Sequence, residues 1–252
     1  MTAPNIVHFI WLTGPKARPF SYINRIAVMA AADVQKPSRI IMWCNEEPMG
    51  NEHWDAVKHL FEFRRVSPPV SIGGEPLQYV QYQADVLRLW IIMQRGGIYI
   101  DTDSLLLRPL TPLMDEPFTL ARESKDSIAM APIIAEPEQL FPKLWLERLP
   151  AALRDDVWAN HAVNLPHELC DEYSSFGLCD VRPQHEFFPL DLKRNYLMEE
   201  KPDQIEESLT RIGDAYAIHV YETYWRDYIG AIGPEYMKTR DSLFTRLFGK
   251  YA

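Results

Sequence analysis

The 252-residue sequence predicts an α/β fold, because strand-like and helix-like segments alternate along it. Residues 5–11 and 38–44 are β-branched and aromatic runs, which indicate buried strands. Between them, residues 20–33 carry apolar side chains at helical spacing behind a candidate N-cap, Ser21. A strand, a helix and a second strand in this order are typical of a βαβ unit.

The clearest helix of the sequence covers residues 77–95 and ends at a glycine pair, Gly96 and Gly97. A short apolar run, Ile98–Ile100, follows at once and predicts a buried strand. Further helices are expected at 52–63, 138–149, 151–163 and 241–248, strands near 63–66 and at 117–121, 127–134 and 214–220, and loops at 71–76 and 167–194. Because no repeat, low-complexity tract or linker interrupts this order, we expect residues 1–252 to form a single domain.

The composition is that of an ordinary globular protein. Hydrophobic residues make up 47% of the chain, and 35 acidic residues against 26 basic ones give a net charge of −9. This balance offers no electrostatic footprint for nucleic acid or for an anionic membrane. It is compatible with an enzyme that gathers carboxylates around a metal ion.

The cysteines and the opening residues favour a cytoplasmic protein. Cys44, Cys170 and Cys179 form no CxxC pair, and an odd count is best explained by free thiols. Together with His161 and His167, the last two cysteines match no common zinc spacing. The first residues lack the features of a signal peptide, and no stretch approaches the ~20 apolar residues of a membrane span.

Two carboxylates one residue apart, Asp101 and Asp103, end the strand at Ile98–Ile100. Unpaired carboxylates at the edge of a core are costly, so such a pair usually meets a cation, an arginine or backbone N–H groups. Oxygen ligands suit a hard divalent ion such as Mg²⁺ or Mn²⁺, which often holds substrate phosphates. The pattern therefore fits a metal-phosphate site, and it also fits an acidic turn that merely caps a strand.

A charged pair, Asp85 and Arg88, lies three residues apart on one face of the helix at 77–95. Since this helix is apolar nearly all round, we expect the pair to be partly buried and directed at another group. Trp11, at the end of the first strand, fits either a core position or an indole face on which a nucleotide base stacks.

Taken together, these features resemble a known family. Asp85 and Arg88, followed by the glycine pair, Tyr99, Asp101 and Asp103 in register, resemble the sugar-binding region of DXD glycosyltransferases. These are related to yeast α-1,6-mannosyltransferase, to capsular polysaccharide synthesis enzymes and to the glucosyltransferase domains of clostridial toxins. The resemblance implies a GT-A fold, a nucleotide-binding sandwich with a central mixed, mostly parallel sheet flanked by helices.

The resemblance also implies how a nucleotide-sugar donor is bound. Trp11 would stack on the base, while Asp85 and Arg88 would contact the donor sugar. The guanidinium of Arg88 can make two parallel hydrogen bonds, a geometry that lysine cannot copy. Tyr99 and Asp101 would hold the ribose or the metal.

For the metal, commonly Mn²⁺ with Mg²⁺ as the alternative, the resemblance implies Asp103 as a direct ligand beside Asp101. The cation would stabilise the charge that grows on the departing diphosphate, with Asp103, Asp101 and Arg88 as the catalytic set. His219 occupies the place of a late metal ligand or diphosphate contact, with Glu222 as a competitor and a hydrogen-bonded strand histidine as the plain alternative. Trp225 would close a C-terminal loop over the diphosphate.

One departure from the family concerns the segment after this strand. Relatives often carry an asparagine near the donor sugar there, whereas residues 124–132 contain none. Asp126 or Ser127 is the expected substitute.

Two other classes compete with a glycosyltransferase. An aspartate-nucleophile phosphatase would use Asp101 as the nucleophile and Asp103 as the general acid, but the nearest candidate for its later acidic motif, Gly213–Asp214, lacks the following acid. A non-catalytic nucleotide- or sugar-binding module would use the same residues without turnover.

The expected reaction is retaining hexose transfer. We expect a UDP-sugar donor, with GDP-mannose second, and a saccharide or glycolipid acceptor in surface polysaccharide synthesis. A protein acceptor is the lesser expectation. Nucleic acid is not an expected partner, and any association with a membrane would be peripheral.

Overall fold

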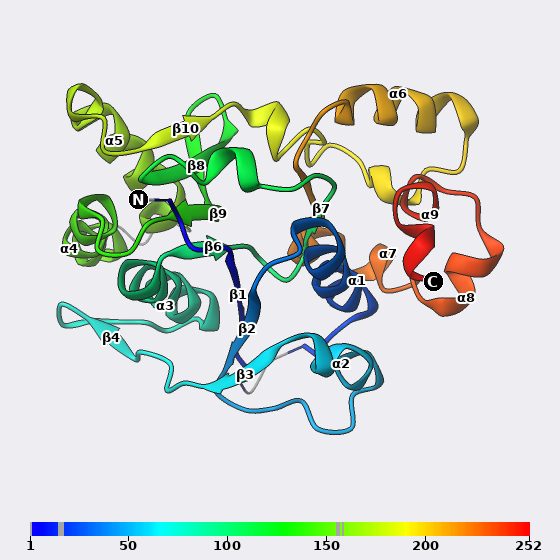
Figure 1. Cartoon of the computed structure of the whole chain (residues 1–252), viewed down its shortest axis with the longest axis horizontal. Coiled ribbons are helices and arrows are strands. Elements are labelled where there is room, and N and C mark those ends of the chain that lie inside the picture. Colours follow the sequence, from blue (N-terminus) through cyan, green and yellow to red (C-terminus); the bar gives the residue numbers. More distant parts are fainter. Residues whose placement is uncertain (1, 15–17, 155–156, 158) are drawn as a thin grey trace.

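A seven-stranded mixed sheet forms the centre of the protein (Figure 1). The computed structural model describes residues 2–14, 18–154, 157 and 159–252. The strands lie in the order β10 (Asp180–Arg182), β8 (Phe118–Ser124), β9 (Ser127–Ala135), β6 (Gly97–Tyr99), β1 (Ile6–Trp11), β2 (Arg39–Cys44) and β3 (Glu62–Arg65). Only the pairs that β9 forms with β6 and β8 are antiparallel, so this sheet is mostly parallel, as predicted.

Helices cover both faces of this sheet (Figure 1). Alternate side chains of β2 point to opposite faces: Ile41 and Trp43 pack in the core with α3, α4 and α5, whereas Ile40 and Met42 pack in the core that includes α1 and α2. The helices are α1 (Tyr22–Ala30), α2 (Glu52–Val57), α3 (Val80–Arg95), α4 (Leu140–Arg154), α5 (Leu165–Glu172), α6 (Pro202–Ile212), α7 (Glu222–Ile229), α8 (Pro234–Thr239) and α9 (Leu243–Phe248). A third core joins α1 to α6, α8 and α9.

Two small ribbons lie outside the central sheet. β7 (Ser104–Leu106) pairs antiparallel with β11 (Ala217–His219), which attaches the C-terminal part of the chain to the segment after β6. β4 (Ser71–Ile72) and β5 (Glu75–Pro76) form a short hairpin, so the expectation of a loop over 71–76 is wrong.

The sequence patterns missed helices in the second half of the chain. α5 lies in the region expected to be a loop, and α6 and α8 were not expected. Each of the three has a proline in its first turn, where the missing N–H costs nothing, so a residue that breaks helix interiors here starts a helix.

The break expected at Pro150 is also wrong, because α4 continues through it to Arg154. The buried side chains of Trp145 and Leu149 show that packing outweighs the lost backbone hydrogen bond. The helix expected over 151–163 includes residues 155, 156 and 158, which lie outside the described residues, and its end, Asn160–Asn164, is a π-helical turn.

The glycine pair between α3 and β6 allows the backbone to turn where there is no room for a side chain. Gly96 and Gly97 have φ values of 62° and 97°. A Cβ on Gly96 would lie 2.7 Å from the carbonyl oxygen of Ala135, and one on Gly97 would lie 2.7 Å from that of Ile6. The pair therefore lets α3 end directly against the sheet, so that β6 starts at once.

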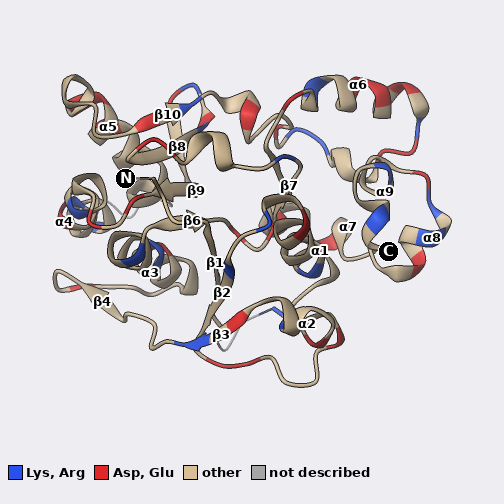
Figure 2. Cartoon of the chain, in the orientation of Figure 1, with Lys and Arg blue, Asp and Glu red and all other residues tan. Residues whose placement is uncertain are grey.

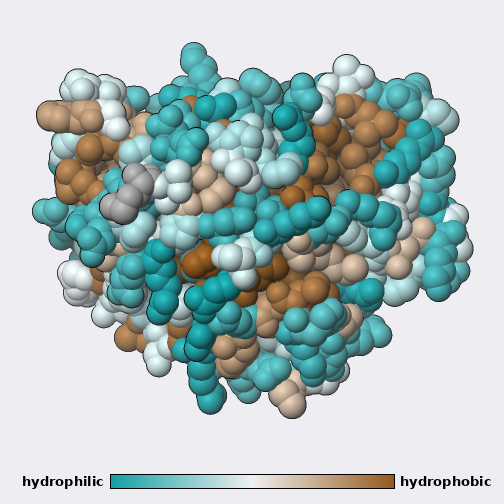
Figure 3. Space-filling model, viewed as in Figure 1, coloured by the Kyte–Doolittle hydropathy of each residue, from teal (hydrophilic) through white to brown (hydrophobic). Residues whose placement is uncertain are grey.

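The surface is polar and carries both charges. Figure 2 shows acidic and basic residues interspersed along the outer helices, and Figure 3 shows a mostly hydrophilic face interrupted by brown, apolar areas. Among the helices that the structure describes, none contains a stretch long and apolar enough to cross a membrane.

His8 is fully buried in the middle of the sheet and joins the glycine pair to β2. The indole of Trp43 donates to its Nδ1 at 3.2 Å, so the ring carries its proton on Nε2, which donates to the carbonyl of Gly96 at 3.1 Å. Burial lowers the pKa of His8 from 6.5 to about 4, although the hydrogen bond to Gly96 opposes this shift.

The stability of the protein should therefore fall as the pH drops from about 6.5 to 4. The unfolded chain takes up a proton on His8 below pH 6.5, whereas the folded chain resists it until about pH 4, so stability is full above this window and is lost within it. The difference amounts to about 3 kcal/mol. Urea unfolding of the wild type and of His8→Gln across this range would measure it, and a pH-independent difference between the two proteins would contradict it.

Candidate active site

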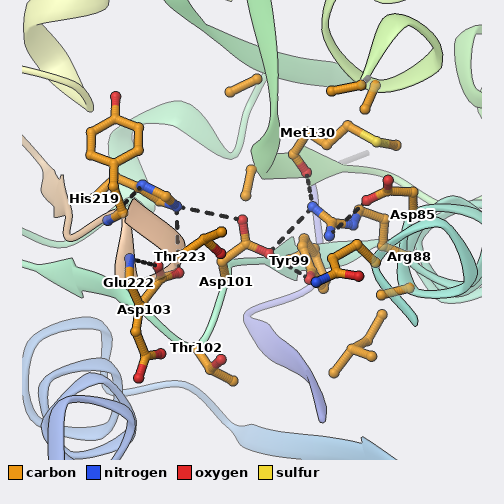
Figure 4. Close-up of a pocket in the computed structure, with 18 of the residues that line it drawn as sticks. Asp85, Arg88, Tyr99, Asp101, Thr102, Asp103, Met130, His219, Glu222 and Thr223 are labelled. Atoms are coloured by element: carbon orange, nitrogen blue, oxygen red, sulfur yellow. Dashed lines mark hydrogen bonds and ion pairs between the residues drawn. The ribbon is translucent and has the colours of Figure 1, made fainter. Parts of the chain in front are cut away.

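A pocket of about 440 Å³ opens at the ends of β1 and β6 (Figure 4). Parallel strands end at the same edge of a sheet, so the turns after β1 and β6 meet there. The β11–α7 turn reaches this edge because β11 pairs with β7 in a register that sets His219 opposite Ser104, beside the acidic turn. The predicted site residues that line the pocket are Trp11, Asp85, Arg88, Tyr99, Asp101, Asp103, His219 and Glu222.

On one side of the pocket, Asp85 and Arg88 of α3 form a buried ion pair at 2.9 Å. The other carboxylate oxygen of Asp85 lies 2.9 Å from Nε2 of His161, which is 1% exposed. His161 sits in the π-helical turn before α5, and this turn also supplies Ala162 and Val163 to the pocket wall. The expectation of a partly buried, directed pair on α3 is therefore correct.

Arg88 connects this pair to the acidic turn. Its guanidinium lies 3.3 Å from a carboxylate oxygen of Asp101, donates to the carbonyl of Met130 at 3.1 Å and packs over the ring of Tyr99 at 4.6 Å. The hydroxyl of Tyr99 donates to Asp101 at 2.8 Å. Burial alone would raise the pKa of Asp101, but Arg88 and His219 hold it well below its usual range.

Asp101, Asp103 and His219 form a group that could hold a metal ion. Each offers one ligand atom, and these atoms all lie within 4.8 Å of one another. Nε2 of His219 lies 3.4 Å from Asp103 and 3.8 Å from Asp101. Burial would lower the pKa of His219, but the two carboxylates raise it to about 10. Two carboxylates and an imidazole are a plausible donor set for a divalent ion, so the residues fit such an ion.

The turn between β11 and α7 fixes this group from the C-terminal side. Tyr221 has a φ of 55°, which is unusual for a residue with a side chain and is frequent at functional sites. Its N–H donates to Nδ1 of His219 at 3.3 Å, and the next N–H, that of Glu222, donates to Asp103 at 2.9 Å. The carboxylate of Glu222 instead accepts from Asn24 at 3.1 Å. Of the two competitors, His219 is the one whose side chain joins the aspartates.

The two tryptophans expected to contact the donor differ in their positions. Trp11 lines the pocket and packs edge-on against Phe20 at 5.1 Å. Trp225 lies in the helix α7 rather than in a loop. It packs against the core that includes α1 and α2 and against the core that joins α1 to α6, α8 and α9, and it is not among the pocket-lining residues. The C-terminal loop expected around Trp225 is therefore a helix, and the contact of Trp225 with the donor stays a prediction.

The substitutes expected for the missing asparagine are also displaced from the pocket. Asp126 and Ser127 belong to the tight turn between β8 and β9, where the hydroxyls of Ser124 and Ser127 are 2.6 Å apart, and neither lines the pocket. In this segment of the chain, the acidic side chain that lines the pocket is that of Glu123, just before the turn.

Sequence reasoning missed Glu123, His161 and Tyr221 as parts of the site. Glu123 lies in a strand segment whose pattern is not distinctive, and Tyr221 is marked only by its unusual backbone angle. His161 was considered only with His167 and the cysteines as a zinc set, and its ring nitrogen is used by Asp85 instead. The available signal was that a buried aspartate, such as Asp85, needs a donor, and a histidine is one candidate.

Comparison with known structures supports the assignment of the fold. The chain is similar in fold to the PaToxG glycosyltransferase, with a TM-score of 0.50 and 8% identity, over 100% of this chain and 87% of that one. It also matches the glycosyltransferase GlyE of Streptococcus pneumoniae TIGR4 with a TM-score of 0.47 and 11% identity, over 99% of this chain and 60% of that one. The fold is of the GT-A type, as predicted.

Comparison of sequences gives the family region. Residues 35–119 match the family described as glycosyltransferase sugar-binding region containing DXD motif. A curated relative, glucan organizing enzyme 1 of Cryptococcus neoformans var. grubii serotype A (strain H99), is 25% identical over 267 residues, which cover 98% of this chain and 70% of the relative. The chain is a glycosyltransferase that carries this sugar-binding region, and Asp101 and Asp103 are the aspartates of its DXD motif.

A glycosyltransferase is favoured over the two competing interpretations, an aspartate-nucleophile phosphatase and a non-catalytic binding module. The aspartate-nucleophile phosphatase needs a second acidic motif at the site, but the side chain of Asp214 is fully exposed and pairs with Arg108 at 3.4 Å, outside the set of pocket-lining residues. A non-catalytic module is likewise set aside, because the matched region is that of an enzyme class.

The bond between His161 and Asp85 should contribute measurably to stability. His161→Phe would leave a buried carboxylate short of one donor and should lower the free energy of unfolding by about 2 kcal/mol. His167→Phe is the matched control, since its pair with Asp171 is longer, at 3.8 Å, and the side chain of Asp171 is 68% exposed, so the pair contributes less than about 1 kcal/mol. Urea unfolding measures both changes, and equal losses would show that the buried pair has no special weight.

Proposed function

We propose that the protein is a metal-dependent, retaining glycosyltransferase that moves a hexose from a nucleotide-sugar donor to a saccharide or glycolipid acceptor. The observation that carries this proposal is the continuity of two groups in one pocket: the ion pair of Asp85 and Arg88, and the candidate metal group of Asp101, Asp103 and His219. The first suits the hydroxyls of a sugar, and the second suits a diphosphate with its cation.

The metal would be held by Asp103, Asp101 and His219. We favour Mn²⁺ over Mg²⁺, because Mg²⁺ is usually bound through oxygen ligands and this group adds an imidazole. When bound, a divalent cation supplies a positive charge that stabilises the leaving diphosphate. The backbone N–H of Glu222 and the side chain of His219 keep Asp103 in place for this role.

The donor would lie across the pocket from β1 to α3. The half-exposed face of Trp11 would stack on the base, and Tyr99 with Asp101 would meet the ribose. Asp85 and Arg88 would bind the hydroxyls of the hexose, Asp85 as acceptor and Arg88 as donor. Because His161 and Asp101 hold this pair in advance, little reorganisation is needed when the sugar binds.

Transfer would occur with retention at the anomeric carbon. The bond from this carbon to the phosphate oxygen breaks, and the bond to the acceptor oxygen forms on the same face of the sugar. The proton of the acceptor hydroxyl passes to the departing phosphate oxygen, so the step needs no enzymic nucleophile. Arg88 stabilises the sugar end of the pocket throughout.

We favour a UDP-hexose as donor, with GDP-mannose second, from Trp11 and from the resemblance to the glucosyltransferase domains of clostridial toxins. The acceptor would be a growing surface polysaccharide or a lipid-linked saccharide, reached through peripheral association with a membrane, and a protein is the lesser candidate. We place this reaction in the cytoplasm and assign it to one domain made of residues 1–252. Screening UDP- and GDP-sugars for Mn²⁺-dependent thermal stabilisation would identify the donor.

Asp103→Asn should reduce Mn²⁺-dependent nucleotide release by more than about 100-fold, since losing even an outer partner of a metal site costs roughly 10–100-fold. EDTA should stop the wild type in the same way, and added Mn²⁺ should restore it. Asp241→Asn, which alters an exposed pair with Arg246, is the control for the loss of an acidic side chain. An active Asp103→Asn enzyme that keeps its metal dependence would contradict the mechanism.

A further inference from the structure

Glu123, at the end of β8, is an unpaired carboxylate in the pocket. The other carboxylates that line the pocket have partners: Asp85 with Arg88, Asp101 with Tyr99, Asp103 with His219, and Glu222 with Asn24. Among the described residues, none forms a hydrogen bond or an ion pair with Glu123. Glu123 also lies outside the candidate metal group.

Leaving this carboxylate unpaired is costly for the folded protein. Burial raises the pKa of Glu123, although the positive charge of His219 opposes the shift. A partly desolvated carboxylate without a donor stabilises neither the core nor the network beside it. Its free oxygens line a cavity, so a ligand that brings a hydroxyl or an N–H would satisfy them.

Glu123 lines the same pocket as the candidate metal group. The charges of His219 and Asp101, two members of that group, act on its carboxylate. Glu123 in turn acts on the phenol of Tyr221, as does Tyr224. Glu123 and Tyr224 both line the pocket, and Tyr224 lies in the first turn of α7, directly after the turn that carries His219 and Tyr221.

Exposed aromatic rings lie on α7, whose first turn lines the pocket. Tyr224 lines it and is 65% exposed, and Tyr228, one helical turn later on α7, is 61% exposed. An aromatic face that is open to solvent beside hydrogen-bonding groups is suited to the apolar face of a pyranose ring. The two features, an acceptor of hydrogen bonds and an aromatic face, are those needed to bind one neutral sugar.

We propose that Glu123 and Tyr224 form a subsite for the acceptor, a neutral pyranoside whose hydroxyl donates to the carboxylate of Glu123 while its ring packs against Tyr224. The proposal rests on the transferase function given above and adds to it the class of acceptor. Acidic sugars are excluded, because Glu123, Asp101 and Asp103 would repel a second carboxylate. Glu123 acts by orienting the acceptor, and the proton of the reacting hydroxyl still passes to the phosphate.

The test measures saccharide binding by saturation-transfer NMR to the protein loaded with UDP and Mg²⁺, because paramagnetic Mn²⁺ would broaden the signals of a bound saccharide. The probes are methyl α-D-glucopyranoside, methyl α-D-mannopyranoside and the methyl glycoside of glucuronic acid. The wild type should bind at least one neutral glycoside and reject the acidic one. Glu123→Leu should weaken that binding by about tenfold or more and Glu123→Gln by less, as expected for losing a hydrogen bond to a charged group. Tyr224→Ala should also weaken it, and Phe176→Ala, at an exposed ring outside the pocket-lining set, should not.

Stability distinguishes this role from a structural one. Since Glu123 has no partner in the folded protein, Glu123→Leu should unfold at the same temperature as the wild type or higher, whereas a structural role predicts a lower one. Unchanged glycoside binding in Glu123→Leu and Tyr224→Ala would overturn the subsite, and so would a wild type that binds UDP but no neutral glycoside. If neither UDP nor GDP with Mn²⁺ raises the melting temperature of the wild type, the proposed function fails and the subsite fails with it.

Discussion

The burial of Arg88 is the constraint on which the site depends. A guanidinium cannot be left unpaired in a core, and its charge is matched by Asp85 on its own helix and by Asp101 on the next strand. This pairing links α3 to the end of β6, so the helix and the acidic turn cannot move independently. The glycine pair makes the link short enough, because it lets the chain pass from α3 to β6 with no room for a side chain between them.

The carboxylates that line the pocket outnumber its basic side chains, so the pocket carries excess negative charge. Five acidic side chains line it, against two arginines and the imidazole of His219. A diphosphate would be repelled from such a surface unless a cation accompanied it. The charge balance of the described pocket thus supports the proposed divalent ion independently of the distances within the candidate metal group.

The part of the site that could be predicted from the sequence is the part that is local in the chain. Asp85, Arg88 and the acidic turn lie within one helix and the strand that follows it, so helical spacing and a glycine stop suffice to relate them. His219 entered only through the resemblance to a family, because its position depends on the register of β11 against β7. The same holds for Glu123 and His161. They reach the pocket because segments that are distant in the chain pack together, and no local pattern indicates this packing.

The fold shows the same division between local and distant information. The strands β1, β2, β3, β6, β8 and β9 and the long helix α3 were predicted closely, since their apolar patterns are regular. The helices α5, α6 and α8 were not, because they are short and are stabilised by packing in the cores rather than by their own sequences. Prolines in their first turns also resembled breaks.

The two sides of the pocket differ in how far their side chains are already paired. Around Arg88 every carboxylate has its partner in the folded protein, so binding there exploits a geometry that folding has already established. Around Glu123 and Tyr224 the polar and aromatic groups have no such partners among the described residues, so they are open to a ligand. Selection can therefore alter this second side with little loss of stability, whereas a change at Arg88 or Asp85 leaves a charge buried alone. This asymmetry would let related proteins keep one donor site while their acceptors diverge.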